Sequence, residues 1–450
     1  MLKLLSRIFL ATFICLAVSN VSSGQMTSNQ NGKVDRTFGT YGFAHMMPSR
    51  RGNAIVLGNG IAFAVTTTIL PFPAIGLSIS KQLADGSFDT GFGQNGLSNT
   101  TFPRYVDPQS IVVQPDGKIL IGGYINPSAP TNGWDYFLAR FLPNGQLDTL
   151  FGSGGFVALD IAPDTNDPAD FSYDTVGSII VNDDGTILVS GTSDQRLASQ
   201  SKTCVKAVLA KFRSDGTLET SFGSQGISSL TLIINEGFTF GSSPLRLKSI
   251  GNGKYIGGIG LIRGQFGDPN RQPAILIRYL ENGAIDKSFG VGGIVDLTVG
   301  SPVNLNVILY DFTVLMDGKL LVLTAGALNR LKPDGSVDET FGDNGRLRIS
   351  HDATTGFTVV SDGSIITSGL LFRSTSSGNR TSSELRKYFS DGSPDVRFGI
   401  SGRLSVDTPE YDTYLGSIFQ LLDSTINVIG YRTIYNGQIF RSKISIKRKL

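Results

Sequence analysis

The chain has 450 residues, and its 39 Lys and Arg against 37 Asp and Glu leave a formal charge of +2 at pH 7. This balance gives no steering field toward phosphate or anionic lipid, so it excludes an electrostatically driven nucleic-acid partner. A hydrophobic content of 40%, only 17% charged residues and 55 glycines are typical of a globular, turn-rich β-protein and exclude a disordered chain.

Residues 1–24 have the features of a secretory signal peptide. Lys3 and Arg7 supply a positive start, an apolar run follows, and residues 22–24 offer a small-residue cleavage site. The apolar run is too short to span a bilayer, and no later segment contains roughly 18 consecutive apolar residues. We therefore expect an exported protein without a transmembrane segment, located outside the cell, at its surface or in the periplasm. Residues 25–32 form a short lead.

Removal of that signal leaves Cys204 as the single cysteine. One thiol forms neither an intramolecular disulfide nor a thiolate metal site. We interpret Cys204 as an incidental thiol where a loop enters a strand.

A phrase that ends in Phe-Gly recurs seven times along the chain. Each copy begins with an Asn-Gly or Asp-Gly turn and reaches Phe-Gly three residues after an acidic position. The repeat length is about 60 residues, which is the size of one small β-sheet. The sequence therefore predicts one array of like units rather than unrelated domains. The seven phenylalanines are Phe38, Phe92, Phe151, Phe222, Phe289, Phe341 and Phe398.

Each unit also contains a hairpin signal, as in residues 110–123, where β-branched residues flank Asp116-Gly117. The hairpin strands are nearly continuous apolar runs, which indicates strands covered on both faces. The strand after Phe-Gly alternates polar with apolar residues, as in 346–349, which indicates a half-exposed strand. A four-stranded unit with buried inner strands and an exposed outer strand is a propeller blade.

The recurring phenylalanine is predicted to pack in the core between blades, and the acid three residues before it to cap a turn. These acids could instead suggest a ring of metal ligands, but a residue repeated in every blade indicates an architectural role. They are Asp89, Asp148, Glu219, Asp286, Asp338 and Asp395.

The two ends of the chain complement each other. The C-terminal unit supplies a hairpin around 423–424 and a strand at 443–447 but no Phe-Gly, whereas residues 31–43 supply the missing piece. We therefore predict that residues 33–450 form an all-β fold, a single seven-bladed β-propeller with four antiparallel strands per blade. Its last blade is closed by the N-terminal segment, which removes exposed edge strands. A monomer is expected.

The pattern Asp-Gly-x-Leu-Asp-x-x-Phe-Gly-x-x-Gly resembles that of the delta-60 repeat family, bacterial exported proteins with NHL-like propeller repeats. The match recurs from about residue 31 to the C-terminus. The fifth blade departs from it by having almost no loop between Leu323 and Ala327, and the seventh by Ser424 in place of a turn glycine. The resemblance implies a propeller fold and adds little about chemistry.

The two faces of such a propeller differ in this sequence. The turns between strands one and two and between strands three and four form the turn face, which carries the near-constant Asp-Gly phrases. The other loops form the variable face, and binding residues gather on variable loops held by a rigid scaffold. We therefore predict a ligand on the variable face at the mouth of the central channel. Its longer segments are 124–136, 158–173, 191–206, 259–273, 297–309 and 370–383.

Four residues in these segments are candidate binding residues. Trp134 is the only tryptophan; exposed, its ring could stack on a sugar or anchor a protein, and buried, it would pack one blade against the next. Arg263 and Arg271, with Asp268 between them, could bind a carboxylate or a sulfated glycan, or could form a solvated loop.

The sequence offers few candidate residues for a metal site or for catalysis. An acidic cluster could suggest calcium, but it lacks the alternating order of a calcium loop, so we expect an acidic surface loop and no metal. The only histidines, His45 and His351, are isolated, and no nucleophile elbow, phosphate loop or dinucleotide fingerprint is present. No catalytic residue or cofactor is predicted. The acidic cluster is Asp160, Asp164, Asp167 and Asp170.

The sequence thus favours a binding or scaffolding module of the cell envelope or exterior, with a glycan or protein ligand. One alternative is a propeller hydrolase or lyase acting on extracellular polysaccharide, whose paired carboxylates would come from loops of different blades. Another is a passive structural repeat. The fold alone does not choose among them.

Overall fold

The computed structural model describes most of the repeat region, and every regular element in it is a β-strand. The signal segment 1–24 and the lead 25–32 lie outside the described residues. Among the residues that the structure describes, no helix is long and apolar enough to cross a membrane. The described ranges are 33–34, 43–45, 52–57, 59–69, 75–126, 133–161, 171–197, 202–236, 243–260, 274–297, 308–349, 353–375, 378–406, 411–420, 426–434 and 439–447.

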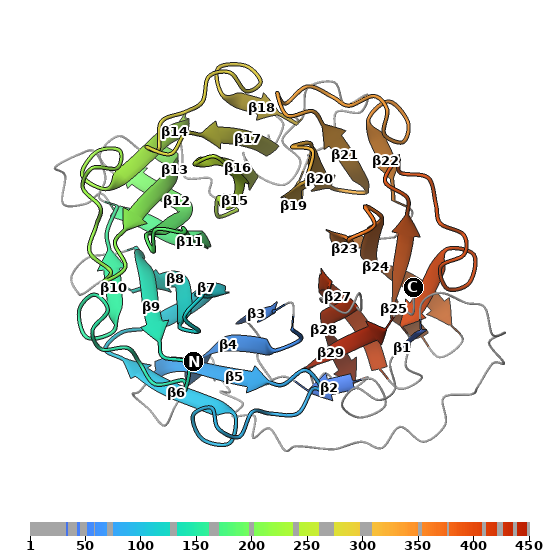
Figure 1. The fold of residues 1–450 in the computed structure, drawn as a ribbon, viewed down its shortest axis with the longest axis horizontal. Helices are drawn as coiled ribbons and strands as arrows, with labels where there is room; N and C mark the ends of the chain where they lie inside the picture. The colour runs from blue at the N-terminus through green and yellow to red at the C-terminus, as the bar shows by residue number, and fades with distance from the viewer. Residues whose placement is uncertain are drawn as a thin grey trace, which may run out of the picture.

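Six four-stranded antiparallel sheets follow one another around a ring (Figure 1). The first two contain β3 (Gly52–Val56), β4 (Ala62–Ile69), β5 (Ile75–Gln82) and β6 (Leu97–Phe102), then β7 (Val106–Val113), β8 (Ile119–Ile125), β9 (Asp135–Phe141) and β10 (Phe156–Leu159). The next two contain β11 (Phe171–Val181), β12 (Ile187–Leu197), β13 (Lys202–Phe212) and β14 (Ile227–Glu236), then β15 (Arg246–Gly251), β16 (Lys254–Gly260), β17 (Ala274–Tyr279) and β18 (Ile294–Asp296). The last two contain β19 (Leu309–Val314), β20 (Leu320–Thr324), β21 (Ala327–Leu331) and β22 (Arg346–Arg348), then β23 (Ala353–Val359), β24 (Ile365–Thr375), β25 (Gly378–Tyr388) and β26 (Arg403–Val406).

The two ends of the chain meet in one further sheet. Its strands are β27 (Tyr411–Gln420), β28 (Ile426–Ile434) and β29 (Ile439–Lys447), together with β1 (Lys33–Val34) and β2 (Phe43–His45). Both N-terminal strands pair antiparallel with β29: Lys33 lies opposite Lys447, and Phe43 lies opposite Ile444. The N-terminal segment thus lies beside the C-terminal strand, as the repeat pattern predicts.

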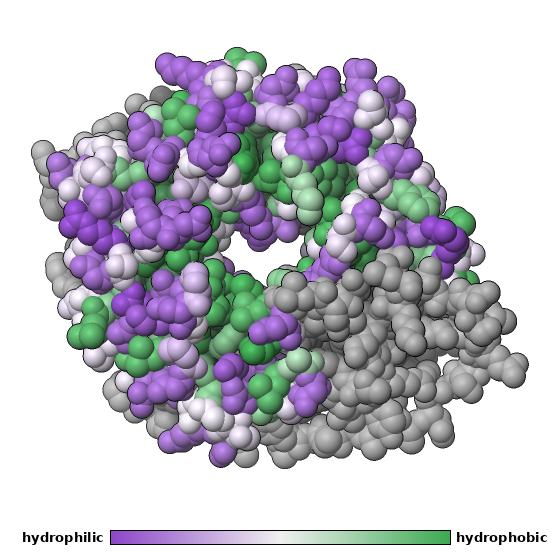
Figure 2. Space-filling view, in the orientation of Figure 1, coloured by the Kyte–Doolittle hydropathy of each residue, from purple (hydrophilic) through white to green (hydrophobic). Residues whose placement is uncertain are grey.

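Within each four-stranded sheet the strands run outward from the centre in chain order (Figure 1). The first strand of each sheet therefore lies innermost, beside the centre of the ring. The space-filling view shows an opening at this centre (Figure 2). The fold is a β-propeller.

The hairpin turns form as the Asp-Gly signals predict. Between β7 and β8, Asp116 Oδ1 accepts a hydrogen bond from Lys118 N at 3.1 Å, and Gly117 has a φ of +83°. Only glycine adopts this conformation without strain. The turn therefore places β7 and β8 in register, with Val113 opposite Ile119.

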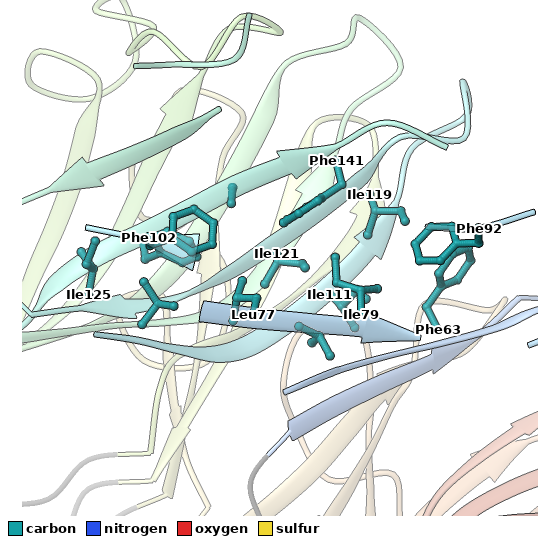
Figure 3. Close-up of a cluster of buried hydrophobic side chains, with 14 residues drawn as sticks. Phe63, Leu77, Ile79, Phe92, Phe102, Ile111, Ile119, Ile121, Ile125 and Phe141 are labelled. Carbon is teal, nitrogen blue, oxygen red and sulfur yellow. The ribbon is translucent and has the colours of Figure 1, made fainter. Parts of the chain in front are cut away.

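The core consists of apolar side chains packed between neighbouring sheets. Between the first two sheets, Phe63 and Ile79 lie against Ile119 and Ile121 in one buried cluster (Figure 3). Because both faces of each inner strand are covered in this way, the strands carry continuous apolar runs rather than alternation.

The recurring phenylalanine links each sheet to the next, and its predicted core position is confirmed. All six described copies are at most 3% exposed, whereas Phe38 lies outside the described residues. After Phe151, Gly152 N donates a hydrogen bond to Asp215 O, in the turn of the following repeat, at 2.8 Å. The same bond recurs for Gly93 to Asn144, Gly223 to Asn282, Gly290 to Asp334 and Gly342 to Asp391.

The acid before each phenylalanine has the predicted architectural role. Asp338 Oδ1 accepts from Thr340 N at 3.3 Å, which caps the turn, while its Oδ2 pairs with Arg330 Nε at 2.8 Å. Arg330 also lies over the Phe341 ring at 4.7 Å and donates to Ser390 O of the next repeat at 2.6 Å. This arginine clamp recurs at Arg140 and Arg278.

Candidate ligand-binding site

Five aromatic side chains gather on the variable face where the β7–β10 sheet meets the β11–β14 sheet. We call Tyr105, Tyr124, Trp134, Tyr173 and Phe171 the aromatic arc. Tyr105 precedes β7, Tyr124 lies at the end of β8 and Trp134 precedes β9, while Phe171 and Tyr173 lie at the start of β11. These strand ends carry the loops of the variable face. Four of the rings are half-buried and Tyr124 is buried.

The rings form one continuous chain of contacts. Tyr124 stacks on Trp134 with centroids 4.3 Å apart and planes at 17°. Trp134 contacts Tyr173 at 4.8 Å in an edge arrangement, and Tyr173 contacts Phe171 at 5.4 Å. Tyr105 lies 6.3 Å from Tyr124 at the other end. The arc therefore crosses from one sheet to the next without a break.

Trp134 is fixed by its main chain as well as by its ring. Its N–H donates to Ser172 O at 3.0 Å, and its carbonyl accepts from Asp174 N at 2.8 Å, which forms a parallel bridge to β11. β11 is the innermost strand of its sheet, so Trp134 lies on the edge that faces the central opening. Gly133 permits this approach, since a Cβ there would lie 1.9 Å from Ser172 O. The ring thus packs one sheet against the next and remains half-exposed at the channel mouth.

A buried carboxylate orients the first two rings of the arc. Asp107 is 1% exposed, and its Oδ2 accepts from Tyr105 Oη at 3.1 Å and from Tyr124 Oη at 3.3 Å. Its Oδ1 accepts from Gln109 Nε2 at 2.7 Å. Burial, with the Asp107 charge, raises the pKa of Tyr105, so the Tyr105 phenol remains a protonated donor.

A partly buried ion pair, Arg104 with Asp135, lies beside Trp134. Arg104 Nη1 donates to Asn126 O at 2.7 Å and lies 3.5 Å from Asp135 Oδ2. Burial and the nearby Asp160 carboxylate raise the pKa of Asp135.

A second acid is fully enclosed behind the arc. Asp174 is 0% exposed, and its Oδ2 accepts from Ile161 N at 2.6 Å. Burial raises its pKa to about 8, so this carboxyl is protonated at neutral pH. Asp174 Oδ1 and Tyr136 Oη make no hydrogen bond within the described structure, although both residues are at most 2% exposed.

The other predicted site residues have different outcomes. Arg263, Asp268 and Arg271 lie outside the described residues, so their role stays a prediction. Of the acidic cluster only Asp160 is described, and it accepts from Ser172 Oγ at 3.5 Å. Within the described ranges, no three His, Cys, Asp or Glu side chains are grouped to hold a metal. Cys204 is buried in β13.

The sequence analysis named Trp134 as a candidate binding residue, which stays a prediction, but did not name the rings that contact it. Tyr124 and Tyr173 stand at the ends of two segments that had been assigned to the variable face, so their aromatic character was a usable signal. It was missed because the two segments are about 50 residues apart and belong to different repeats.

Comparisons with known proteins support the fold. A family model described as "Domain of unknown function (DUF5122) beta-propeller" matches residues 114–151, about two thirds of one repeat. No curated protein sequence matches the chain significantly.

Solved structures similar to this chain include a protein of unknown function from Dyadobacter fermentans, at 13% identity and a TM-score of 0.41, covering 93% of this chain and 98% of that one. A Trypanosoma rangeli sialidase mutant that displays trans-sialidase activity shares 11% identity at a TM-score of 0.38, covering 93% and 57%. A thermostable family-43 glycoside hydrolase shares 12% identity at a TM-score of 0.32, covering 84% and 98%.

Proposed function

We propose that the chain is an exported seven-bladed β-propeller, spanning residues 33–450, that binds a glycan through the aromatic arc. Six four-stranded sheets and the sheet shared by β1, β2 and β29 support seven blades closed into a ring. Closure of this kind protects the edge strands of an array. The signal-like residues 1–24 support export to the exterior, the surface or the periplasm.

The observation that carries the proposal is the unbroken arc of rings at the channel mouth. Aromatic rings present large, rigid contact area at low entropic cost, and the C–H faces of a sugar are a suitable partner for them. The partly buried guanidinium of Arg104 and carboxylate of Asp135 lie beside the rings and could pair with sugar hydroxyls. A few polar groups set among aromatic side chains are typical of a small-molecule site.

A protein ligand is less well supported than a glycan. Protein interfaces of useful affinity need a broad exposed apolar patch. In the described part of the chain, none of the exposed large apolar side chains belongs to the arc. They are Leu83, Leu150, Val291, Ile308, Tyr310, Met316, Val337, Phe372, Phe389, Val396 and Ile400.

One observation favours a second candidate function, hydrolysis of an extracellular polysaccharide. Asp135 has a raised pKa beside the Asp160 carboxylate, and glycosidases use one protonated and one ionised carboxyl group. By contrast, Asp107 and Asp174 are buried and hydrogen-bonded within the fold. If the chain is a hydrolase, the Asp135→Asn variant will bind the polysaccharide but release no reducing sugar ends from it.

The binding proposal is tested with the mature protein on a glycan array, followed by titration of the best ligand. Trp134 is the only tryptophan, so intrinsic fluorescence reports on the arc directly. We expect its emission to change on binding and the Tyr173→Ala variant to bind at least about tenfold more weakly. The matched control is Phe389→Ala, an aromatic side chain on the turn face that is 37% exposed. Absence of any glycan ligand, or equal effects of the two variants, would contradict the proposal.

A further inference from the structure

Six boundaries between consecutive sheets each contain a buried apolar cluster. At the first boundary, Phe63 of β4 and Phe141 of β9 belong to one such cluster (Figure 3). Equivalent clusters join every later pair of sheets, up to the one that holds Phe398 and Ile426 together. Among the described residues, no such cluster joins the β27–β29 sheet to the β3–β6 sheet, which are neighbours in the ring (Figure 1). We call this last boundary the seam.

One pair of opposed residues accounts for much of each cluster. It consists of a residue near the start of the second strand and a residue at the end of the third strand, and it faces the preceding sheet. In the β7–β10 sheet the pair is Ile119 with Phe141, both 0% exposed. The next four sheets also have two large apolar or aromatic side chains there. The pairs are Ile187 with Phe212, Tyr255 with Tyr279, Leu320 with Leu331, and Ile365 with Tyr388.

The β3–β6 sheet has small and polar residues on its face toward the seam. Ala62 and Gln82 form its opposed pair, and both are 0% exposed, so the seam is closed in this structure. Ser78, 1% exposed, lies on the same face, where β9 carries Phe137. Ser80 Oγ, also buried there, makes no hydrogen bond within the described structure. Such groups stabilise a boundary less than large apolar side chains do.

The arginine clamp is also interrupted at the seam. In the other sheets a basic residue of the third strand lies opposite an apolar residue of the second strand, as Arg140 lies opposite Leu120. The register of β28 and β29 places Ser445 at this position, opposite Asn427. A serine has no charge with which to pair an acid. The last sheet therefore lacks the clamp residue at the position from which the other sheets reach the next repeat.

The N-terminal strands provide a link of a different kind. β1 and β2 pair with β29 of the last sheet, and in the chain they directly precede the β3–β6 sheet. β2 ends at His45 and β3 begins at Gly52, so a short connection joins a strand held by the last sheet to the first sheet. We call β1 and β2 the clasp. Main-chain pairing of the clasp thus links two sheets whose facing side chains contribute little.

We propose that the ring opens reversibly at the seam when the clasp leaves β29. This inference rests on the ring closure proposed above and is independent of glycan binding. Elements that move are drawn from the least stable parts of a structure, and the seam lacks two of the contacts that the other boundaries share. Opening gives the central channel a lateral entrance, through which a polymer enters without being threaded by its end.

Thiol labelling of the mature protein measures the opening. Ser80→Cys places a thiol in the seam, and Ala139→Cys, the matched control, places one at the equivalent buried position of the second sheet. Both variants also carry Cys204→Ala, which removes the natural thiol. We expect iodoacetamide to label the seam thiol at least about tenfold faster than the control under native conditions. Ala210→Cys, at the same position of the third sheet, should match the control. Equal rates for all three variants would overturn the proposal.

A disulfide tests the role of the clasp. Ala44 lies opposite Lys443 where β2 pairs with β29. Opposed residues of an antiparallel pair are close enough for a disulfide, so Ala44→Cys with Lys443→Cys can lock the clasp. Added to Ser80→Cys, the oxidised lock should slow labelling of the seam thiol to the rate of Ala139→Cys, and reduction should restore the faster rate. Labelling that is equally fast in both states would overturn the clasp mechanism.

The outcomes separate the seam from the ring itself. Failure of the lock to oxidise would overturn the proposed closure of the ring, and the seam with it. An oxidised lock together with equal labelling of Ser80→Cys and Ala139→Cys would leave the closed ring standing and overturn its opening.

Discussion

The ring of Phe222 lies against the α-carbon of Gly283 in the following repeat, so closely that a Cβ on Gly283 would come within 2.5 Å of Phe222 Cζ. Gly283 also has a φ of +84°, and Gly223 N donates to the neighbouring Asn282 O at 3.2 Å. The Phe-Gly phrase of one repeat and the Asn-Gly turn of the next are therefore two halves of one contact. This explains why both recur together along the chain.

Replacement of Gly283 by alanine should destabilise the protein by about 3 kcal/mol, because it adds backbone strain and displaces the Phe222 ring. The matched control is Gly292→Ala, where φ is +64° and nothing lies within 4 Å of the added Cβ. That control should cost only about 1 kcal/mol. Urea unfolding measures both variants. Equal destabilisation would show that the contact between repeats contributes nothing.

The arginine clamp should stabilise the boundary between the β19–β22 and β23–β26 sheets. Arg330→Met removes one of the two cations that pair with the buried Asp338, leaving Lys319 at 3.2 Å, and should cost about 2 kcal/mol at pH 7. Arg330→Lys should cost less, because lysine occupies the same position in three repeats, at Lys81, Lys211 and Lys387.

The effect of Arg330→Met should depend on pH with a definite sign. The Thr340 hydroxyl and the cations of Lys319 and Arg330 hold the pKa of Asp338 well below its ordinary value. A depressed folded-state pKa stabilises the protein above the unfolded-state pKa of about 4, and this contribution is lost as pH falls further. The gap in unfolding free energy between wild type and Arg330→Met should therefore shrink below about pH 4. A gap that is constant with pH would contradict this account.

Asp174 should produce the opposite pH dependence. Its pKa is raised to about 8 in the folded protein, so between about pH 4 and pH 8 the folded state holds a proton that the unfolded state has lost. Stability should fall as pH rises through this window, by on the order of 5 kcal/mol. The Asp174→Asn variant should lack this slope. Thermal unfolding from pH 4.5 to pH 8.5 measures it, and parallel curves for the two proteins would rule out a buried neutral acid.

Trp134 should contribute to stability as well as to binding, because its ring packs between Tyr124 and Tyr173. Trp134→Ala should cost about 2 kcal/mol, less than a fully buried tryptophan, while Trp134→Phe should recover most of it. Denaturant unfolding followed by circular dichroism tests this, with Phe389→Ala as the control at an exposed site. A cost near zero for Trp134→Ala would indicate that the ring does not join the two sheets.

The sequence predicted the repeated parts of this structure because they depend on local chemistry. Asp116-Gly117 specifies its turn through a side-chain acceptor and a positive φ, and both operate within three residues. The burial of Phe151 also followed from its recurrence. A basic residue stands eight positions before each of the six acids, as Arg140 does before Asp148. This equally regular spacing could have predicted the arginine clamp.

The aromatic arc could not be assembled in the same way. The contact of Trp134 with Tyr173 depends on a parallel bridge between a loop of one sheet and the inner edge of the next. No local pattern encodes such a bridge, since it requires the relative placement of two sheets. The sequence could therefore assign Trp134 to the variable face but could not name the residues that surround it.

Hydrogen–deuterium exchange of the mature protein, with and without a saturating glycan ligand, tests the central claim most directly. We predict protection of peptides from the variable face, those that contain residues 104–107, 124–126, 133–136 and 171–174. Peptides that contain the Asp-Gly turns of the opposite face should exchange at the same rate with and without ligand. Protection confined to those turns would contradict the assignment of the aromatic arc as the binding site.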